Sequence, residues 1–301
     1  MARFRKALTL FDDYYDMLAD DVRMAAYSRA IERVVRPGDV VIDLGAGLGI
    51  LSFLAVKAGA ERVYAIEKGD SIDLARAVAT HNGLDDRIEF IAANSKDVTV
   101  DQLVRPADVL LSETLGSFAV DENTLAFTID ARDRLLTPEA RLLPAALRLW
   151  LGPVTAPEEH GRVSFWNDVC GIDYGPAIDQ ILGRMSLAEF TTEQLLAEPL
   201  VYAQLDLATI DDSSLEQTLH FDIVRAGTLH GLAGWFEAEL CEGVIIETAP
   251  DVPATHWKQA LFPFRTPIEV EPGHRLSVVL RAGPKADRSD DTAISYEYVY
   301  R

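Results

Sequence analysis

The sequence has few cysteines and no long apolar run. Only Cys170 and Cys241 occur among 301 residues, and a secreted domain held together by disulfides needs more, so we expect two free thiols in a reducing cytoplasm. No apolar run approaches the ~20 residues of a membrane-spanning helix. The basic start of the chain is followed at once by acidic residues, unlike a secretory signal. We therefore expect a cytoplasmic protein without a membrane partner.

Positive charge is also scarce. Lysine and arginine number 28 against 48 aspartates and glutamates, which gives a formal net charge of −20. Such a surface repels phosphate backbones and argues against nucleic acid as a partner. It would attract cationic ligands, but taken by itself the charge is better explained by a general solubility bias. The 49% of hydrophobic residues indicate a globular protein with a substantial core.

Apolar runs alternate with helix-like segments between residues 39 and 143. Because the apolar runs are nearly continuous, they are typical of buried parallel strands. We expect strands in 39–45, 62–67, 87–92 and 107–113, and helices in 48–60, 71–83 and 123–136. This βαβ series predicts a Rossmann-like, doubly wound parallel sheet.

The pattern changes after Pro144. Short β-branched or aromatic segments bounded by turns, such as 147–151, 230–240 and 274–282, predict an antiparallel β-barrel or sandwich. One helical island interrupts them, and residues 177–190 have helical spacing within it. We expect three parts: an N-terminal helical segment (1–37), the Rossmann-like domain (38–143) and the β-domain (144–301), with a helical arm at about 160–198.

A glycine-rich turn follows the first expected strand. The stretch VIDLGAGLG contains Asp43, Gly45 and Gly47, and glycines at this point allow a tight turn and close approach of a ligand. Glu67 ends the next strand, where an acidic residue commonly accepts hydrogen bonds from ribose hydroxyls. The DxGxGxG spacing is typical of S-adenosylmethionine sites, whereas nicotinamide sites usually have GxGxxG. Asp43 itself is expected to hold the turn more than to contact the ligand.

Two glutamates flank a short loop after the fourth strand. Glu113 and Glu122 lie on either side of a Gly-Ser turn in the stretch SETLGSFAVDE. Ligands of such sheets bind outside the carboxyl ends of the strands, so both carboxylates are expected near one cavity. In isolation they could be solvated loop residues.

Several stretches together resemble one family. VVIDLGAGLGIL, AIEKGD, SETLGSFAVDE and THWKQ occur in the order and approximate spacing of the protein arginine N-methyltransferases. MLADDVR resembles the helix that precedes the family's sheet domain, and SFWNDVCGIDY resembles the start of its dimerisation arm. The resemblance covers nearly the whole chain. It implies methyl transfer from S-adenosylmethionine to an arginine guanidino nitrogen by a homodimer, in a cytoplasmic protein without a metal site.

The resemblance also implies roles for individual residues. Asp43, Gly45, Gly47 and Glu67 would line the cofactor site, and Arg23 would pair with the cofactor's carboxylate. Glu113 and Glu122 match the guanidinium-binding glutamates. His256 and Asp20 match a histidine–acid pair, and Trp257 beside them is expected near the substrate. Either His256 or Glu122 would receive the proton that methylation releases. His256 could instead be an ordinary structural residue of the barrel, and Arg23 could instead bridge Asp20 or Asp21 on its helix.

The chain departs from the family pattern at three places. Thr114-Leu115 replace the usual Trp-Met, and LGSF resembles the branch that makes symmetric dimethylarginine, whereas Met17 matches a position associated with asymmetric products. Lys96 falls where an adenine-contacting glutamate is usual, so we expect Ser95 and Asp97 near the adenine. The aromatic-rich segment that usually precedes the first helix is shortened to RFRKALTLF.

These departures leave the methyl acceptor open. An arginine in a protein or peptide is the leading hypothesis, and free arginine or another small guanidino compound is the alternative. A catalytically silent S-adenosylmethionine-binding protein is a hypothesis of another class, although the two retained glutamates argue against it. A nicotinamide oxidoreductase is disfavoured by the glycine spacing.

Overall fold

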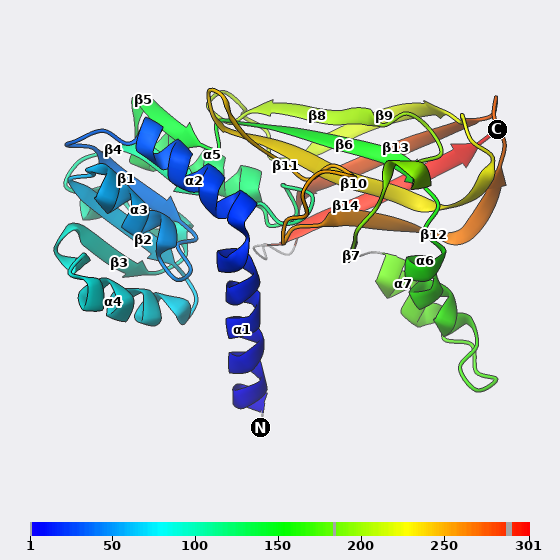
Figure 1. The fold of residues 1–301 in the computed structure, drawn as a ribbon, viewed down its shortest axis with the longest axis horizontal. Coiled ribbons are helices and arrows are strands. Elements are labelled where there is room, and N and C mark those ends of the chain that lie inside the picture. Colours follow the sequence, from blue (N-terminus) through cyan, green and yellow to red (C-terminus); the bar gives the residue numbers. More distant parts are fainter. Residues whose placement is uncertain (1, 183–184, 287–290) are drawn as a thin grey trace.

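The computed structural model describes residues 2–182, 185–286 and 291–301. It contains a parallel α/β unit and an antiparallel β unit side by side, as Figure 1 shows. Helix α1 (Ala2–Ala19) and the segment with α6 and α7 extend from the same side of the molecule. None of the described helices is long and apolar enough to cross a membrane.

Five parallel strands form the α/β unit, in the order β3-β2-β1-β4-β5. The central strand β1 is buried at every position, which explains its uninterrupted apolar sequence. The elements are β1 (Val40–Leu44), α3 (Ile50–Ala58), β2 (Arg62–Glu67), α4 (Ser71–Asn82), β3 (Ile88–Ala92), β4 (Ala107–Ser112), α5 (Thr124–Leu135) and β5 (Leu136–Leu143). The predicted Rossmann-like sheet is confirmed.

Helix α2 (Asp21–Val34) lies against both units. Asp20 caps it by accepting a hydrogen bond from the backbone N–H of Arg23, and Tyr27 and Ile31 are fully buried. The helix contacts α3 in the sheet unit and strands β10 and β11 in the barrel. It therefore fixes Asp20 and Arg23 at the junction of the two units.

The antiparallel unit consists of a six-stranded and a three-stranded sheet. Its strands are β6 (Ala146–Val154), β7 (Ser186–Ala188), β8 (Leu200–Asp206), β9 (Leu215–Asp222), β10 (Gly227–Cys241), β11 (Val244–Glu247), β12 (Gln259–Val270), β13 (Arg275–Pro284) and β14 (Thr292–Tyr300). A Cβ at Gly234 of β10 would lie 2.8 Å from both Phe118 and Phe262. Only glycine therefore lets Phe118, from the glutamate loop, pack against the barrel.

The arm contains α6 (Pro157–Ser164) and α7 (Gly175–Leu182). The expectation of a helix through residue 190 is wrong, because Ser186–Ala188 form β7 and pair with the edge of β12. Residues 183–184, inside the expected arm, lie outside the described residues. Three further strands, β5, β8 and β11, were not predicted. Pro138 and alternating polar residues weaken the pattern of β5 and β8, and β11 has only four residues. The proposed domain boundaries stay a prediction, although β5 ends at Leu143 and β6 begins at Ala146.

Candidate functional site

A cavity of about 410 Å³ lies at the carboxyl end of the parallel sheet. This volume falls in the usual range for small-molecule sites. The walls come from the glycine turn after β1, the end of β2, the loop after β4 and helix α1. The lining includes eight of the predicted site residues: Arg23, Asp43, Gly45, Gly47, Glu67, Ser95, Glu113 and Glu122. Asp20, Asp97, His256 and Trp257 do not line it.

The glycine turn is open toward the cavity because Gly45 and Gly47 have no side chains. Gly45 and Gly47 have φ angles of 74° and 53°, which L-residues with side chains rarely adopt. A Cβ at Gly45 would lie 2.8 Å from the Thr114 methyl group. Asp43 is buried, and its carboxylate accepts hydrogen bonds from the backbone N–H and hydroxyl of Ser52 at 2.9 and 2.6 Å. Burial raises the pKa of Asp43 to about 6. Asp43 therefore ties the turn to α3.

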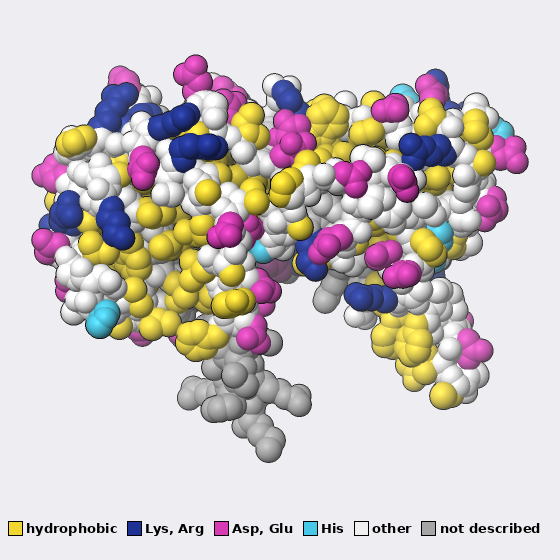
Figure 2. Space-filling view, viewed as in Figure 1, with side chains coloured by type: hydrophobic (Ala, Val, Ile, Leu, Met, Phe, Trp, Pro, Cys, Tyr) yellow, Lys and Arg dark blue, Asp and Glu magenta, His cyan; other side chains and the backbone are white. Residues whose placement is uncertain are grey.

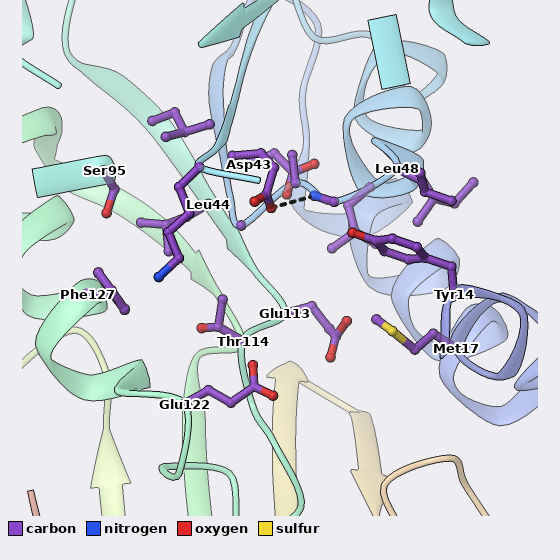
Figure 3. A pocket seen from close by; sticks show the side chains of 18 of the residues that line it. Tyr14, Met17, Asp43, Leu44, Leu48, Ser95, Glu113, Thr114, Glu122 and Phe127 are labelled. Atoms are coloured by element: carbon purple, nitrogen blue, oxygen red, sulfur yellow. Dashed lines mark hydrogen bonds between the residues drawn. The ribbon is translucent and has the colours of Figure 1, made fainter. Parts of the chain in front are cut away.

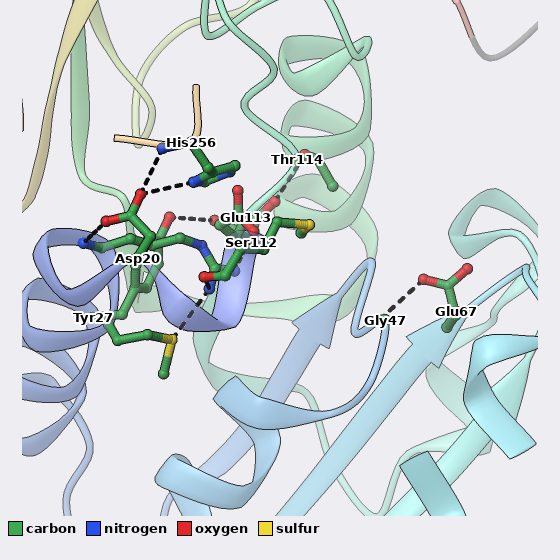
Figure 4. A network of polar contacts seen from close by, with 11 residues as sticks. Asp20, Tyr27, Gly47, Glu67, Ser112, Glu113, Thr114 and His256 are labelled. Atoms are coloured by element: carbon green, nitrogen blue, oxygen red, sulfur yellow. Dashed lines mark hydrogen bonds and ion pairs between the residues drawn. The ribbon is translucent and has the colours of Figure 1, made fainter. Parts of the chain in front are cut away.

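Glu67 and Ser95 lie on the sheet side of the cavity. The Glu67 carboxylate accepts hydrogen bonds from the N–H groups of Gly47 and Gly69, at 3.1 and 2.6 Å. It thus closes the glycine turn from the neighbouring strand (Figure 4). Ser95 is buried at the start of a short 3₁₀ turn, whereas Asp97 at the end of the same turn is exposed. Of the two residues expected near adenine, only Ser95 faces the cavity.

The loop from Glu113 to Glu122 is held by a residue that the sequence analysis did not single out. The Asp121 carboxylate accepts hydrogen bonds from the N–H groups of Phe118 (2.7 Å) and Ser117 (3.3 Å). Gly116 has a φ of 53°, and a Cβ there would overlap this carboxylate. Burial raises the pKa of Asp121 to about 6. The sequence signal that could have indicated this role is an aspartate a few residues after a Gly-Ser turn.

The two glutamates face the same cavity. Figure 3 shows the carboxylates of Glu113 and Glu122 directed into it, with Thr114 between their backbones and Met17 across from Glu113. Burial raises the pKa of Glu122 to about 7, with further contributions from the negative charges of Asp121 and Glu113. Two close carboxylates in a partly dry cavity favour a delocalised cation between them.

Arg23 lies between this pair and the expected cofactor site. It forms a buried ion pair with Glu113, and its Nη1 donates to the Met17 carbonyl at 3.1 Å. Arg23 is 3% exposed, and its Nε–H is a buried donor without a partner among the described residues. A buried guanidinium with an unused donor favours a further anionic partner, such as a ligand carboxylate.

Asp20 and His256 form a contact pair next to the cavity. One carboxylate oxygen of Asp20 lies 2.9 Å from both the backbone N–H and Nδ1 of His256. Burial alone would raise the pKa of Asp20, but the hydrogen bonds from Arg23 and His256 hold it below its usual value. The hydrogen-bonded chain in Figure 4 runs from His256 through Asp20 to Arg23 and Glu113.

Trp257 connects the barrel to the glutamate loop. Its side chain is 3% exposed and packs edge-on against Phe236, with ring centroids 5.5 Å apart. Its carbonyl oxygen accepts a hydrogen bond from the Ser117 hydroxyl at 2.6 Å. The structure thus gives Trp257 a packing position, whereas substrate contact stays a prediction.

Two aromatic lining residues escaped the sequence analysis. Tyr14 from α1 lies over the glycine turn, 3.1 Å from where a Cβ of Gly47 would stand. Phe127 from α5 lies on the Ser95 side (Figure 3). Flat apolar side chains on two walls suit a ring system such as a nucleobase.

Comparison with known proteins agrees with this geometry. Residues 148–300 match the model of the arginine methyltransferase oligomerization subdomain, and residues 27–121 match that of ribosomal protein L11 methyltransferase. The chain is 33% identical to protein arginine N-methyltransferase 6 of Xenopus laevis, over 85% of this chain and 79% of the relative. It is 30% identical to the Danio rerio protein of the same name, over 96% of this chain and 88% of that relative.

Solved structures resemble this chain over nearly its full length. The Trypanosoma brucei PRMT1 enzyme–prozyme heterotetrameric complex with AdoHcy superposes with a TM-score of 0.83 at 25% identity, covering 96% of this chain and 93% of that one. Arabidopsis thaliana protein arginine methyltransferase 10, in an open conformation, superposes with a TM-score of 0.79 at 26% identity. The match covers 96% of this chain and 92% of that one. The chain belongs to the protein arginine N-methyltransferase family.

Proposed function

We propose that this chain transfers methyl groups from S-adenosylmethionine to a guanidino nitrogen of arginine within a protein or peptide. The observation that carries the proposal is the placement of Glu113 and Glu122 in the same cavity as the glycine turn. This arrangement puts a cation clamp next to a site for the methyl donor. The two accessible cysteine positions, exposed Cys170 and half-buried Cys241, support a cytoplasmic location.

The cavity fits the cofactor. The glycine turn leaves room at the backbone, and Tyr14 flanks the turn. Glu67 lines the cavity at the end of β2, where an acidic residue commonly accepts hydrogen bonds from ribose hydroxyls. The Nε–H of Arg23, which has no partner in the described part of the chain, is a suitable donor to the cofactor's carboxylate. When bound, S-adenosylmethionine supplies an electrophilic methyl group and leaves as a neutral thioether.

Gly45→Val is expected to weaken cofactor binding, so that the Kd for S-adenosylhomocysteine is at least about a hundredfold higher than in the wild type. The new side chain would meet Thr114 and narrow the cavity, and positive φ adds ~1–2 kcal/mol of strain. Isothermal titration calorimetry measures the Kd. Gly83→Val is the matched control, because Gly83 has a φ of 66° but open space around it. Equal Kd values for the two variants would contradict the assignment.

The glutamates must do two things for the chemistry. Arginine is a poor nucleophile because its positive charge is spread over three nitrogens. Glu113, with its carboxylate beside Arg23, would hold two of these nitrogens and localise the charge on them. The third nitrogen then keeps its electron pair for the new N–CH₃ bond. Positioning of this kind can account for ~7–11 kcal/mol of a barrier.

Glu122 is the better placed proton acceptor. Methylation leaves an extra proton on the nitrogen, and a base with a pKa near the working pH removes it most efficiently. The pKa of Glu122 is raised to about 7 and its carboxylate lines the cavity. His256 does not line the cavity and is bonded to Asp20. We therefore assign proton acceptance to Glu122 and positioning of α2, with Arg23, to the Asp20–His256 pair.

A kinetic comparison decides between protein and free arginine as acceptor. Wild-type protein is incubated with methyl-labelled S-adenosylmethionine and either free arginine or a glycine-rich peptide with one internal arginine. We expect kcat/KM to be at least about tenfold higher for the peptide, because flanking backbone adds contacts outside the clamp. A higher value for free arginine would replace the proposal by the small-molecule alternative.

We further propose a homodimer formed through the arm. Phe165, Ile172 and Tyr174 of the arm are 57%, 57% and 40% exposed. Figure 2 shows hydrophobic surface on the arm, at the lower right. A second hydrophobic area lies in the region of α3 and α4 in the same view. Leu74 of α4 is 37% exposed. Exposed apolar patches of this kind mark protein interfaces. The arm of one copy would cover the sheet domain of the other.

The double variant Phe165→Ser/Ile172→Ser is expected to be monomeric where the wild type is dimeric, because its interface loses its apolar centre. Light scattering after gel filtration measures the mass. The matched control is Val104→Ser/Val299→Ser, whose valines are 67% and 51% exposed away from the arm. A dimeric arm variant, or a monomeric control, would contradict the arm as the interface.

A further inference from the structure

The C-terminal strand pair of the barrel, β13 and β14, reaches the loop that carries Glu122. Thr292 is the first residue of β14 and pairs with Pro284, the last residue of β13. Strand β14 begins near the junction of the barrel with the parallel unit, as Figure 1 shows. Asp291, the residue before Thr292, lines the same cavity as the two glutamates. This end of the strand pair is therefore the part of the barrel that meets the glutamate loop from the C-terminal side.

One hydroxyl group joins the strand pair to the loop at two points. The Thr292 hydroxyl accepts a hydrogen bond from the Asn123 N–H at 2.9 Å and donates one to the Val120 carbonyl at 2.8 Å. Val120 and Asn123 are each only 4% exposed. A buried N–H and a buried carbonyl therefore both depend on the same side chain for their hydrogen bonds. The hydroxyl fixes both ends of segment 120–123, which contains Glu122.

This segment needs support from outside the loop. Asn123 has a φ of 60°, in the left-handed region that residues with a side chain adopt at a cost. Asp121 accepts hydrogen bonds from N–H groups that precede it, so it stabilises the earlier part of the loop. Thr292 holds the later part to the barrel.

The carboxylate of Glu122 depends on its backbone for its position. Among the described residues, no hydrogen bond or ion pair joins this carboxylate to a partner. The carboxylate of Glu113, by contrast, is fixed by its ion pair with Arg23. A displacement of segment 120–123 would therefore move the Glu122 carboxylate and leave that of Glu113 in place. A misplacement of ~1 Å at a reacting group can cost about a hundredfold in rate.

We propose that Thr292 is a positioning residue, whose hydroxyl holds the carboxylate of Glu122 at the nitrogen that is methylated. The inference rests on the proposed function, because Glu122 is the proton acceptor there. It divides the work between the two units. The parallel unit binds the cofactor, and the barrel fixes the base through the start of β14. The ion pair of Lys285 with Asp291, at 2.9 Å, holds this end of the strand pair together.

The test replaces Thr292 by valine, which keeps the shape of the side chain but has no hydroxyl. The Asn123 N–H and the Val120 carbonyl lose their partner, so segment 120–123 is expected to shift toward water. With an arginine peptide, Thr292→Val should have a kcat about tenfold lower than the wild type. Its KM should stay within about twofold, because Glu113 still holds the guanidinium.

The pH profile gives a readout that a purely structural role of Thr292 would not change. Burial raises the pKa of Glu122 to about 7, and access of water to the displaced carboxyl should lower it toward its usual value. The carboxyl then stays ionised to a lower pH. The acidic limb of kcat/KM in Thr292→Val should therefore lie about one pH unit below that of the wild type.

Two variants serve as controls. Thr292→Ser keeps the hydroxyl and should have the kcat and the acidic limb of the wild type. Thr228→Val removes the hydroxyl of another half-buried strand threonine, which donates to Glu269 at 2.8 Å within the barrel. It should also behave as the wild type. If Thr292→Val does not fold, Thr292→Cys repeats the test, because a thiol of similar size forms only weak hydrogen bonds.

A wild-type kcat or an unmoved acidic limb in folded Thr292→Val would overturn the positioning role. Equal losses in Thr292→Val and Thr292→Ser would overturn it as well, since the hydroxyl would then have no part. Absence of methylation by the wild type would instead refute the proposed function. The pKa of Glu122 is then measured by NMR titration of protein with isotope-labelled glutamate, and its signal is identified by its loss in Glu122→Gln. Equal pKa values in the wild type and Thr292→Val would overturn the role of Thr292.

Discussion

Glu113→Gln is expected to lower kcat/KM for an arginine peptide by about a thousandfold, or about 4 kcal/mol. The carboxylate would hold the substrate guanidinium through two charge-assisted hydrogen bonds, each of which contributes ~1.5–3 kcal/mol. A neutral amide keeps the shape of the side chain but neither the charge nor both acceptors. Initial rates with methyl-labelled cofactor measure the loss.

The variant also weakens the buried ion pair of Glu113 with Arg23, so folding must be checked by circular dichroism and thermal unfolding. Glu113→Asp is the second variant. Its side chain keeps the negative charge but is one methylene group shorter, so the carboxylate lies farther from the substrate. It should fold and still lose at least about tenfold in kcat, since a displaced clamp misplaces the nucleophile. Wild-type rates in both folded variants would show that Glu113 holds no substrate.

Glu122→Gln is expected to reduce kcat by about a hundredfold or more, within the ~10²–10⁴ that general acid–base catalysis contributes. It should also change the pH profile. Because the pKa of Glu122 is raised to about 7, the wild-type carboxyl becomes protonated as pH falls, and kcat/KM should fall about tenfold per pH unit below 7. The variant has no such group, so this acidic limb should disappear.

His256→Asn serves as the control for the proton route. His256 is assigned a positioning role, so this variant should lose rate but keep the acidic limb near pH 7. An acidic limb that persists in Glu122→Gln and disappears in His256→Asn would reverse the assignment. The proton would then leave through the Asp20–His256 pair.

The features that could be predicted from the sequence are those that depend on local patterns of residue type. Buried parallel strands such as β1 need continuous apolar residues, and the turn beyond it needs glycines at positive φ. The sequence therefore indicated the sheet, the glycine turn and the glutamate pair. The predicted helix over residues 177–190 is wrong beyond Leu182, because Ser186–Ala188 pair with β12 in spite of their helical spacing.

Long-range contacts could not be predicted. The ion pair of Arg23 with Glu113 joins residues 90 positions apart, and Asp20 meets His256 across 236 positions. Each of these depends on tertiary packing.

The central claim is that the clamp selects arginine as the methyl acceptor. The most direct measurement is to label a mixture of peptides that contain either arginine or lysine at the central position, hydrolyse the products and identify the labelled amino acid. The account predicts methylarginine alone, and its loss in Glu113→Gln. Label on lysine or another residue, or no label while S-adenosylhomocysteine still binds, would contradict it.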